Sequence, residues 1–354
     1  MSASIAEQRL ENQRITRRGR GGPAKMVAWL GAVQAQEYGP AKWSLGLRLP
    51  SGLTDAAVNR AIDRGKILRT HILRPTWHFV APADIRWMLE LTAPEVHRRM
   101  APYDHQLGLD AAVMTRATGI IERALGRERY LTRLELGAQL QRARLPGKST
   151  HLAHIAMHAE LEGVICSGPR RGKQLTYALL ADRAPGARRL SRDEALAELT
   201  RRYFRSHGPA TARDFVWWSG LRTADAKRGL EMNRAKSQEV EGIRYWTIGR
   251  APGRRSARST TVHLLPIYDE YLVAYRDRQA VPHSIYSAWT ASIRHALVIG
   301  GQVAGTWRTN PGVRGVVVEV EAPRRLTAGA RRGLAQAAAR YRRFLGVPVS
   351  LSVV

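Results

Sequence analysis

The chain of 354 residues is long enough for two or three domains, and its 44% hydrophobic residues can build sizeable cores. It carries 57 basic against 29 acidic residues, and this formal net charge of +28 at pH 7 favours an anionic polymer as partner, nucleic acid before a membrane surface. No stretch reaches the roughly 18 consecutive apolar residues of a membrane span, the N-terminus lacks a signal-peptide core, and the single cysteine, Cys166, excludes internal disulfides and multi-cysteine zinc sites. We therefore predict a cytoplasmic protein, with Cys166 as a buried strand thiol.

A first predicted module, of winged-helix type, spans residues 1–108. Apolar residues at spacings of three and four predict a helix from Pro23 to Val33, which Gly39-Pro40 is expected to stop. Around it the pattern predicts helices at 4–15, 54–63, 82–91 and 94–106, a strand at 43–49, and two strands within 67–80 that break at Arg74-Pro75.

A second module, residues 109–189, has the order of a winged helix. It contains a helix at 110–125, a helix that opens with the capping box Thr132-Arg-Leu-Glu135, a helix at 149–161, and strands at 164–167 and 174–180. In such a unit the second helix of the turn motif enters a DNA groove while the hairpin contacts the flanking backbone. The loop at 168–173 therefore places Arg170, Arg171 and Lys173 where DNA phosphates would lie.

A third winged-helix module, residues 190–260, repeats this order. We predict helices at 191–205, 211–218 and 223–234, and strands at 239–248 and 260–275 that flank a basic loop at 249–258. This loop would be a third wing, and its Arg254, Arg255 and Arg258 are predicted DNA contacts.

The last predicted domain, residues 261–354, is rich in strands. Alternating patterns at 295–303, 305–308 and 313–320 precede a helix at 327–345, which together indicate a β-barrel or a small β-sheet domain. The predicted fold class is therefore α+β, with three tandem winged-helix modules before this domain.

Two glutamines, Gln34 and Gln36, stand where a core would be expected, between Trp29 and Trp43. They fall at or just beyond a helix end, where extended backbone brings residues i and i+2 to the same side. A buried amide must satisfy several hydrogen-bonding atoms, so the pair either forms a structural network or faces something polar. The adjacent Glu37 is the nearest group that can act as a base, although a salt bridge at the helix end is equally plausible. We also predict that Lys42 contacts DNA.

Other polar groups favour structural readings. His151, His154 and His158 share one helical face at a spacing that zinc ligands can use, but no carboxylate or cysteine completes the site nearby, so we predict surface or phosphate-contacting histidines and no metal. The acids Asp269, Glu270 and Asp277 are expected to neutralise arginines, although one of them could orient a water. The chain has no Gly-rich phosphate loop, dinucleotide fingerprint, Gly-x-Ser-x-Gly elbow or His-Glu-x-x-His pair, and we predict no cofactor.

Several motifs in this order resemble the AlkZ-like DNA glycosylases, also described as winged helix DNA-binding domain-containing proteins. The motifs are Gln34-Ala-Gln36 after a Trp-Leu-Gly-Ala-Val helix, the stretch 69–80, Gly208 to Phe215, Leu265 to Tyr271, and Gly305-Thr-Trp-Arg308. The resemblance implies three tandem winged-helix units and a C-terminal β-barrel around a DNA-binding channel. It also implies that Gln34 and Gln36 are the catalytic Gln-x-Gln signature.

The resemblance further implies a hydrolase that excises N-alkylated purines from double-stranded DNA, with bulky adducts and interstrand crosslinks as further substrates of some members. Alkylation at N7 or N3 makes the base a good leaving group, so two amides that position a water and the deoxyribose can suffice for catalysis. We expect a monofunctional, monomeric enzyme of DNA repair or genotoxin self-resistance, with Glu37 as a weaker catalytic candidate. The alternative is a non-catalytic winged-helix transcriptional regulator, which the composition fits equally.

Overall fold

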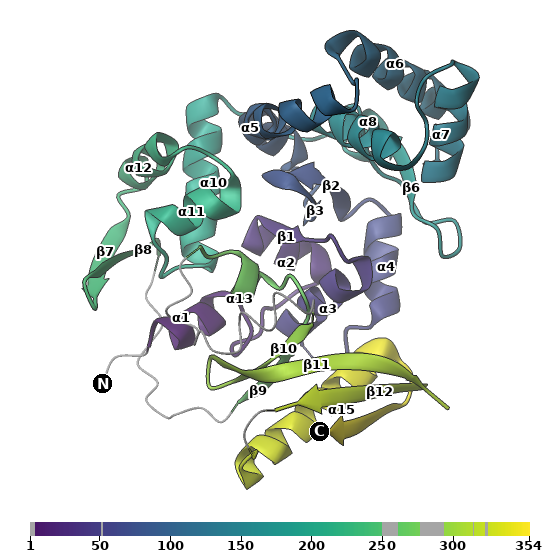
Figure 1. The fold of residues 1–354 in the computed structure, drawn as a ribbon. Coiled ribbons are helices and arrows are strands. Elements are labelled where there is room, and N and C mark those ends of the chain that lie inside the picture. Colours follow the sequence, from purple (N-terminus) through teal and green to yellow (C-terminus); the bar gives the residue numbers. More distant parts are fainter. Residues whose placement is uncertain (1–3, 51, 250–260, 277–293, 314, 323–324) are drawn as a thin grey trace.

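Small antiparallel sheets and the helices that cover them surround the segment that carries Gln34 and Gln36 (Figure 1). The computed structural model describes residues 4–50, 52–249, 261–276, 294–313, 315–322 and 325–354. The helices are α1 (Ile5–Asn12), α2 (Pro23–Leu30), α3 (Tyr38–Arg48), α4 (Asp55–Asp63), α5 (Ile85–Gln106), α6 (Ala111–Glu128), α7 (Arg133–Arg142), α8 (Ser149–Leu161), α9 (Leu180–Arg183), α10 (Arg192–Ser206), α11 (Ala212–Ser219), α12 (Thr223–Met232), α13 (Glu270–Val273) and α15 (Ala328–Leu345).

The strands of the described residues form three small sheets and one larger sheet. They are β1 (Ala32–Gln34), β2 (Leu68–Ile72), β3 (Arg74–Val80), β4 (Leu131–Thr132), β5 (Ile165–Ser167), β6 (Thr176–Leu179), β7 (Lys236–Val240), β8 (Ile243–Thr247), β9 (Val262–Leu265), β10 (His295–Ile299), β11 (Gln302–Gly312), β12 (Gly315–Glu321) and β13 (Val349–Val353). The small sheets have the orders β1-β3-β2, β4-β6-β5 and β7-β8, and the larger one is β13-β12-β11-β10-β9. The fold is therefore mixed α+β, as predicted.

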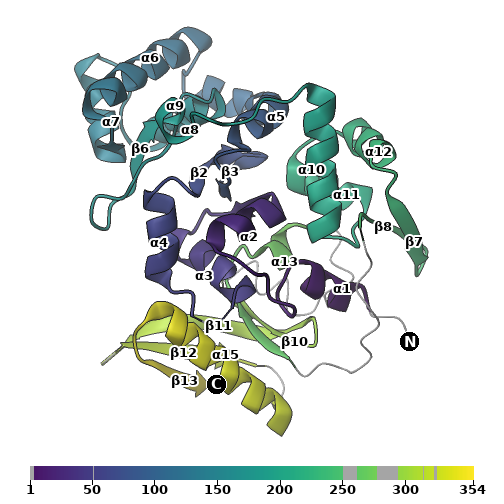
Figure 2. The same cartoon turned by 180° about the vertical axis from the view of Figure 1, so that it is seen from behind.

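The C-terminal sheet and α15 pack against the N-terminal helices, at the foot of the molecule in both views (Figures 1 and 2). Trp43 of α3 contacts Tyr341 and Phe344 of α15, with ring centroids 4.9 and 5.2 Å apart. Arg340 of α15 donates to the carbonyls of residues 46, 47 and 49, which are the orphan acceptors at the end of α3. One hydrophobic core thus joins the two ends of the chain and holds the Gln segment between them.

The segment from 43 to 49 corrects the sequence prediction, because it belongs to α3 and is not a strand. All residues from Ala41 to Arg48 are buried, and a helix that is covered on every side shows no polar face to reveal its period. Gly39-Pro40 likewise does not terminate the preceding helix. That helix ends at Leu30, and Pro40 stands in the first turn of α3, where no intrahelical partner is lost.

Two further boundaries differ from the prediction. Residues 85–106 form the single helix α5, since Pro94 and Pro102 both lie on its exposed face, where water can reach the carbonyls that these prolines leave unpaired. The predicted third wing with its tip at 249–258 is also wrong. β8 pairs with β7 through Glu241-Gly242, both at positive φ, and β9 joins the C-terminal sheet.

Other elements that were predicted from local sequence patterns are confirmed. The capping box at Thr132 and Glu135 is present, helix 327–345 is α15 with Thr327 as its N-cap, and the hairpin at 164–180 is β5 and β6. Cys166 lies buried in β5, and burial raises the pKa of its thiol. Among the described residues, no helix is both long and apolar enough to cross a membrane.

Candidate active site

The two glutamines follow a sharp change of direction in the chain. α2 ends at Leu30, Gly31 turns the backbone at φ 85°, and β1 then pairs antiparallel with β3, placing Gln34 opposite His78. The ladder extends one residue further, because the Ala35 N–H donates to the Trp77 carbonyl at 2.6 Å. The prediction that Gln34 and Gln36 lie in extended backbone beyond a helix end is therefore confirmed.

Both glutamine side chains are held through their carbonyl oxygens. The Arg74 guanidinium donates to Oε1 of Gln34 at 2.8 Å, and the Trp77 backbone N–H donates to Oε1 of Gln36 at 3.3 Å. Each partner can only donate, so the oxygen of each amide must face it, and the Nε2 group points elsewhere. Within the described part of the chain, neither Nε2 donates to a protein group.

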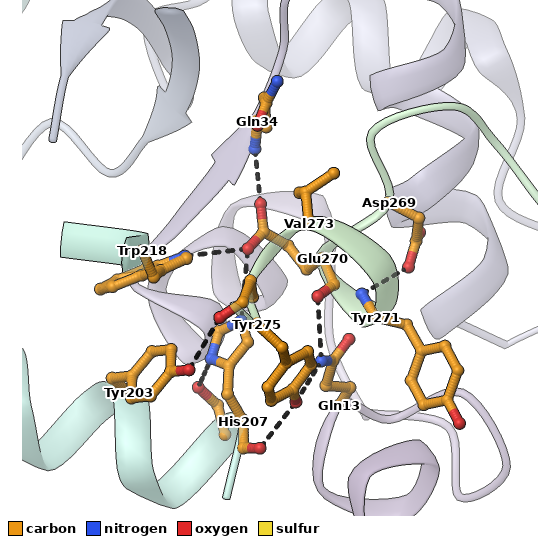
Figure 3. Close-up of polar contacts among 12 residues, drawn as sticks. Gln13, Gln34, Tyr203, His207, Trp218, Asp269, Glu270, Tyr271, Val273 and Tyr275 are labelled. Atoms are coloured by element: carbon orange, nitrogen blue, oxygen red, sulfur yellow. Dashed lines mark hydrogen bonds and ion pairs between the residues drawn. The ribbon is translucent and has the colours of Figure 1, made fainter. Parts of the chain in front are cut away.

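The backbone of Gln34 is anchored by Glu270, the first residue of α13 (Figure 3). The Gln34 N–H donates to Oε1 of Glu270 at 2.7 Å, and the Trp218 indole donates to Oε2 at 2.9 Å. Nε2 of His207 lies 3.4 Å from the same carboxylate. These groups come from β1, α11 and the end of α10, so Glu270 joins three separate parts of the chain at the Gln motif.

Glu270 stays ionised although it is completely buried. Burial alone would raise its pKa, but the contact with His207 and the hydrogen bond from the Gln34 N–H outweigh burial and lower the pKa to about 2. Burial lowers the pKa of His207, and the Glu270 carboxylate partly opposes this effect. Burial lowers the pKa of Arg74, whereas the negative charge of Glu270 raises it. The carboxylate therefore stabilises the charged guanidinium. A fixed negative charge therefore stands directly behind Gln34.

The short helix α13 is itself rigidly attached. Asp269 caps it through a hydrogen bond from the Tyr271 N–H, and it accepts two hydrogen bonds of 2.7 Å from the fully buried Arg48. Gln13 donates to the Glu270 carbonyl at 3.3 Å. The expected neutralisation of an arginine is confirmed for Asp269. Glu270 instead orients the Gln segment, and Asp277 lies outside the described residues.

Strand β3 supplies further polar atoms beside the glutamines. Thr76 Oγ1, Trp77 Nε1 and His78 Nε2 are buried and have no hydrogen-bond partner among the described residues. Burial lowers the pKa of His78 to about 3, so its imidazole is neutral. Successive side chains of a strand point to opposite faces, so Thr76 and His78 leave polar atoms without partners on one face of β3 and Trp77 does so on the other. Trp77 also lines a hollow of about 180 Å³ with Tyr38 and Arg69.

Three members of this network, Arg74, His207 and Trp218, were not singled out from the sequence. The sequence marks Arg74 as a break between strands and as part of the stretch 69–80, without a role of its own, and nothing local to residues 207 or 218 points to position 34. Glu270, an acid in an aromatic stretch, was the sequence feature that could have indicated this network. Its partner Gln34, however, lies 236 positions away in the chain.

Two predicted functional side chains near the motif have contrasting environments. Glu37 is exposed at the N-cap of α3, and its carboxylate has neither a hydrogen bond nor an ion pair with the described residues. Lys42 is buried, and its ammonium pairs with Asp55 at 2.7 Å. The ammonium of Lys42, which is predicted to contact DNA, is therefore already paired with a carboxylate of the protein.

The basic hairpin loop of the second module packs partly against the rest of the protein. Arg170 makes hydrogen bonds with both carboxylate oxygens of Asp63 in α4, and Arg171 pairs with Glu135 at 2.6 Å. Lys173 is exposed at the tip. The predicted contacts Arg254, Arg255 and Arg258 lie outside the described residues.

The histidine face of α8 is turned toward the protein. His154 pairs with Asp104 of α5 at 2.6 Å, and His158 stacks edge-on against His97. The expectation that no carboxylate stands near these histidines is therefore wrong. α8 has no exposed residue between His151 and Leu161, because α5, α6 and β2 cover it, so it is a packing helix and not the predicted recognition helix.

The chain is similar to known proteins in sequence and in fold. The family model described as DNA glycosylase AlkZ-like matches residues 27–344. An interstrand DNA cross-link repair glycosylase from Streptomyces sahachiroi is 24% identical over 329 residues, which are 84% of this chain and 85% of that protein. The solved structure of the Streptomyces sahachiroi DNA glycosylase AlkZ superposes with a TM-score of 0.81 at 21% identity, covering all of both chains.

Proposed function

The chain belongs to the AlkZ-like DNA glycosylase family, and from this premise we propose that it hydrolyses the bond between deoxyribose and an N7- or N3-alkylated purine in double-stranded DNA. The reaction removes the base without cutting the strand, as a monofunctional glycosylase acting as a monomer.

The chemistry of the substrate sets what the protein must supply. An N7- or N3-alkylated purine is cationic, so when the C1′–N9 bond breaks, the bonding pair neutralises the leaving base. The sugar passes through an oxocarbenium-like state, a water oxygen bonds to C1′, and that water releases one proton. Positioning of the water and stabilisation of the developing cation are therefore the main requirements.

The observation that carries the proposal is the way in which the Gln amides are held. Arg74 and the Trp77 N–H fix the two carbonyl oxygens, while both Nε2 groups remain without a protein partner in the described chain. Each Oε1 keeps a second lone pair for a water proton, and each Nε2 can donate to a sugar oxygen or to the water. Amides fixed in advance can bind these groups best in the transition state.

Glu270 contributes through its charge. It lies behind Gln34, is ionised, and stays inside the protein. A buried anion favours a nearby cationic sugar because the surrounding dielectric is low, and Arg74 balances this charge in the resting protein. Glu37 is exposed beside the motif, and we assign it at most the removal of the proton.

The substrate range follows from the relative and from the fold. The Streptomyces sahachiroi protein of the same fold is named for interstrand cross-link repair, and we propose that this chain also unhooks crosslinked or bulky purines, in repair or in self-resistance to one genotoxin. The sheet β4-β6-β5 lies beside α6, α7 and α8, and the hairpin β7-β8 lies beside α10, which supports the proposed second and third winged-helix units, whereas β2 of the first sheet also contacts α8 and β5. The formal net charge of +28 on the chain would favour binding to the DNA backbone.

Alkali-revealed strand cleavage of a duplex with one N7-alkylguanine tests the proposal under single-turnover conditions. We expect the wild type to excise the base, and Gln34→Ala and Gln36→Ala to lower the rate by about a hundredfold each, the typical loss for one positioned hydrogen-bonding group. The double variant should lose less than the product of the two effects, because the residues act as a unit.

Thermal stability and DNA affinity of the same proteins provide the control. If the pair were merely a structural network, truncation would lower the melting temperature and impair binding and turnover together. Wild-type rates in both alanine variants would exclude catalytic roles for the glutamines. Absence of excision on every alkylated duplex, combined with tight binding to one palindromic sequence, would instead support the transcriptional regulator.

A further inference from the structure

Two histidines and a glutamate meet between α5 and α8, outside the Gln34 network. His97 belongs to α5, His158 to α8, and Glu162 is the C-cap of α8. One ligand atom from each of the three lies within 4.8 Å of the others. His158 and Glu162 are four residues apart on one helix, so both can face the same point on α5.

The contact between His97 and Glu162 is not that of a simple hydrogen bond. Nε2 of His97 lies 2.9 Å from Oε1 of Glu162, yet this buried nitrogen has no partner with hydrogen-bond alignment among the described residues. The ring nitrogen and the carboxylate oxygen thus approach each other closely without hydrogen-bond alignment. Two ligands of the same metal ion would have this arrangement. The ring of His158 completes the group, with its centroid 5.1 Å from that of His97.

We propose that His97, His158 and Glu162 form a binding site for a divalent first-row transition metal ion, with Zn²⁺ as the expected occupant. Two imidazoles and one carboxylate are a donor set that suits zinc, whereas magnesium and calcium prefer oxygen ligands alone. Bonds of about 2.0–2.2 Å put tetrahedral ligand atoms roughly 3.3–3.5 Å apart. The three ligand atoms lie within 4.8 Å of one another, so the side chains must adjust to reach this spacing, and a water takes the fourth position. This inference reverses the sequence-based expectation of no metal.

The place of the site in the fold gives the ion a structural role. The inward residues of α5 belong to the hydrophobic core that also contains α10 and α11, whereas most inward residues of α8 belong to the separate core of α6 and α7. An ion bound to both helices would join these two cores. Hollows of about 270 and 610 Å³ on either side, both lined by His97 and Glu162, give an ion and its water access.

Zinc titration of the untagged, metal-stripped full chain by isothermal calorimetry tests the proposal. We expect one Zn²⁺ per chain, with His158→Ala and the milder Glu162→Gln each weakening binding by at least about tenfold. His151→Ala is the matched control, because it removes a histidine from the same helix roughly 10 Å away, and it should bind zinc like the wild type. Saturating zinc should raise the melting temperature of the wild type and of His151→Ala, but not that of His158→Ala.

Either of two results would overturn the site. The wild type could bind zinc no more tightly than His158→Ala and Glu162→Gln, which would leave the trio as an ordinary ion pair beside a histidine. Alternatively, His151→Ala could weaken binding as much as His158→Ala, which would place the zinc elsewhere on the histidine face. Glu162 is half exposed, so the Glu162→Gln protein keeps its fold and the comparison remains decisive.

Discussion

Glu270 shows how a residue far from the motif in sequence can set its geometry. Its carboxylate faces the Gln34 N–H and the Trp218 indole, both of which only donate. In Glu270→Gln, the new amide has one accepting and one donating end, so one of these contacts becomes donor against donor, and the buried negative charge is lost. We expect single-turnover excision to fall by about tenfold to a hundredfold, while lesion-DNA affinity stays near that of the wild type.

Trp218→Phe separates the two contributions of Glu270. It removes one hydrogen bond but keeps the carboxylate charge, so its excision rate should fall less than that of Glu270→Gln. Equal losses would mean that Glu270 acts only by fixing the geometry. An unchanged excision rate in Glu270→Gln would exclude a contribution of this carboxylate to catalysis.

The hairpin of β5 and β6 is the element for which DNA contact can be tested most directly. Arg170 and Arg171 already have carboxylate partners, whereas Lys173 is exposed at the tip. We expect Lys173→Ala to weaken DNA binding similarly for all sequences and to reduce the salt slope by about 0.9, the value for one phosphate contact. Arg170→Ala should mainly loosen the hairpin from α4 and lower the melting temperature.

Fluorescence anisotropy across a salt series measures these slopes. Arg127→Ala, which removes an exposed arginine of α6 in the same part of the chain, is the control and should leave the slope unchanged. A slope in Lys173→Ala equal to that of the wild type would place the hairpin outside the interface.

At the scale of the whole molecule, the buried Glu270 carboxylate links stability to pH. Its pKa is about 2 in the folded protein, below the value near 4.5 expected when unfolded. As the pH falls, the Glu270 carboxylate is therefore protonated in the unfolded chain before it is protonated in the folded protein. Its contribution to stability is complete above about pH 4.5 and is lost as the pH falls toward 2. The shift corresponds to a free energy of unfolding on the order of 3 kcal/mol.

Thermal unfolding at a series of pH values checks this link. The stability of the wild type relative to Glu270→Gln should shrink as the pH falls below about 4.5, since the amide has no proton to gain. The Glu270 charge raises the pKa of the neighbouring His207 and His78, so these histidines can change the difference only in the opposite direction, by taking up protons more readily in the wild type. A difference that does not change with pH would contradict an ionised, depressed Glu270.

Local chemistry in the sequence was enough to locate many of the elements and the Gln34-Ala-Gln36 motif. Caps at Thr132 and Thr327 fix helix starts through bonds to amides three residues away, so neighbouring residues determine them. Gln34 and Gln36 could likewise be placed just beyond a helix end, because the residues next to them in the sequence determine where that helix ends. The period of α3 could not be read, because a helix buried on all sides has no polar face.

Tertiary structure alone decided which side chains complete the site. Arg74 and Glu270 reach Gln34 from 40 and 236 residues away, Trp218 reaches Glu270, and His97 meets His158 across two helices. Such contacts depend on how sheets and helices pack, which no local pattern encodes. The sequence by itself determined the α+β class, the basic charge and the Gln pair. The fold determined the carboxylate behind the pair, the burial of Lys42 and the meeting of histidines with Glu162, because only packing brings distant polar groups into contact and removes them from water.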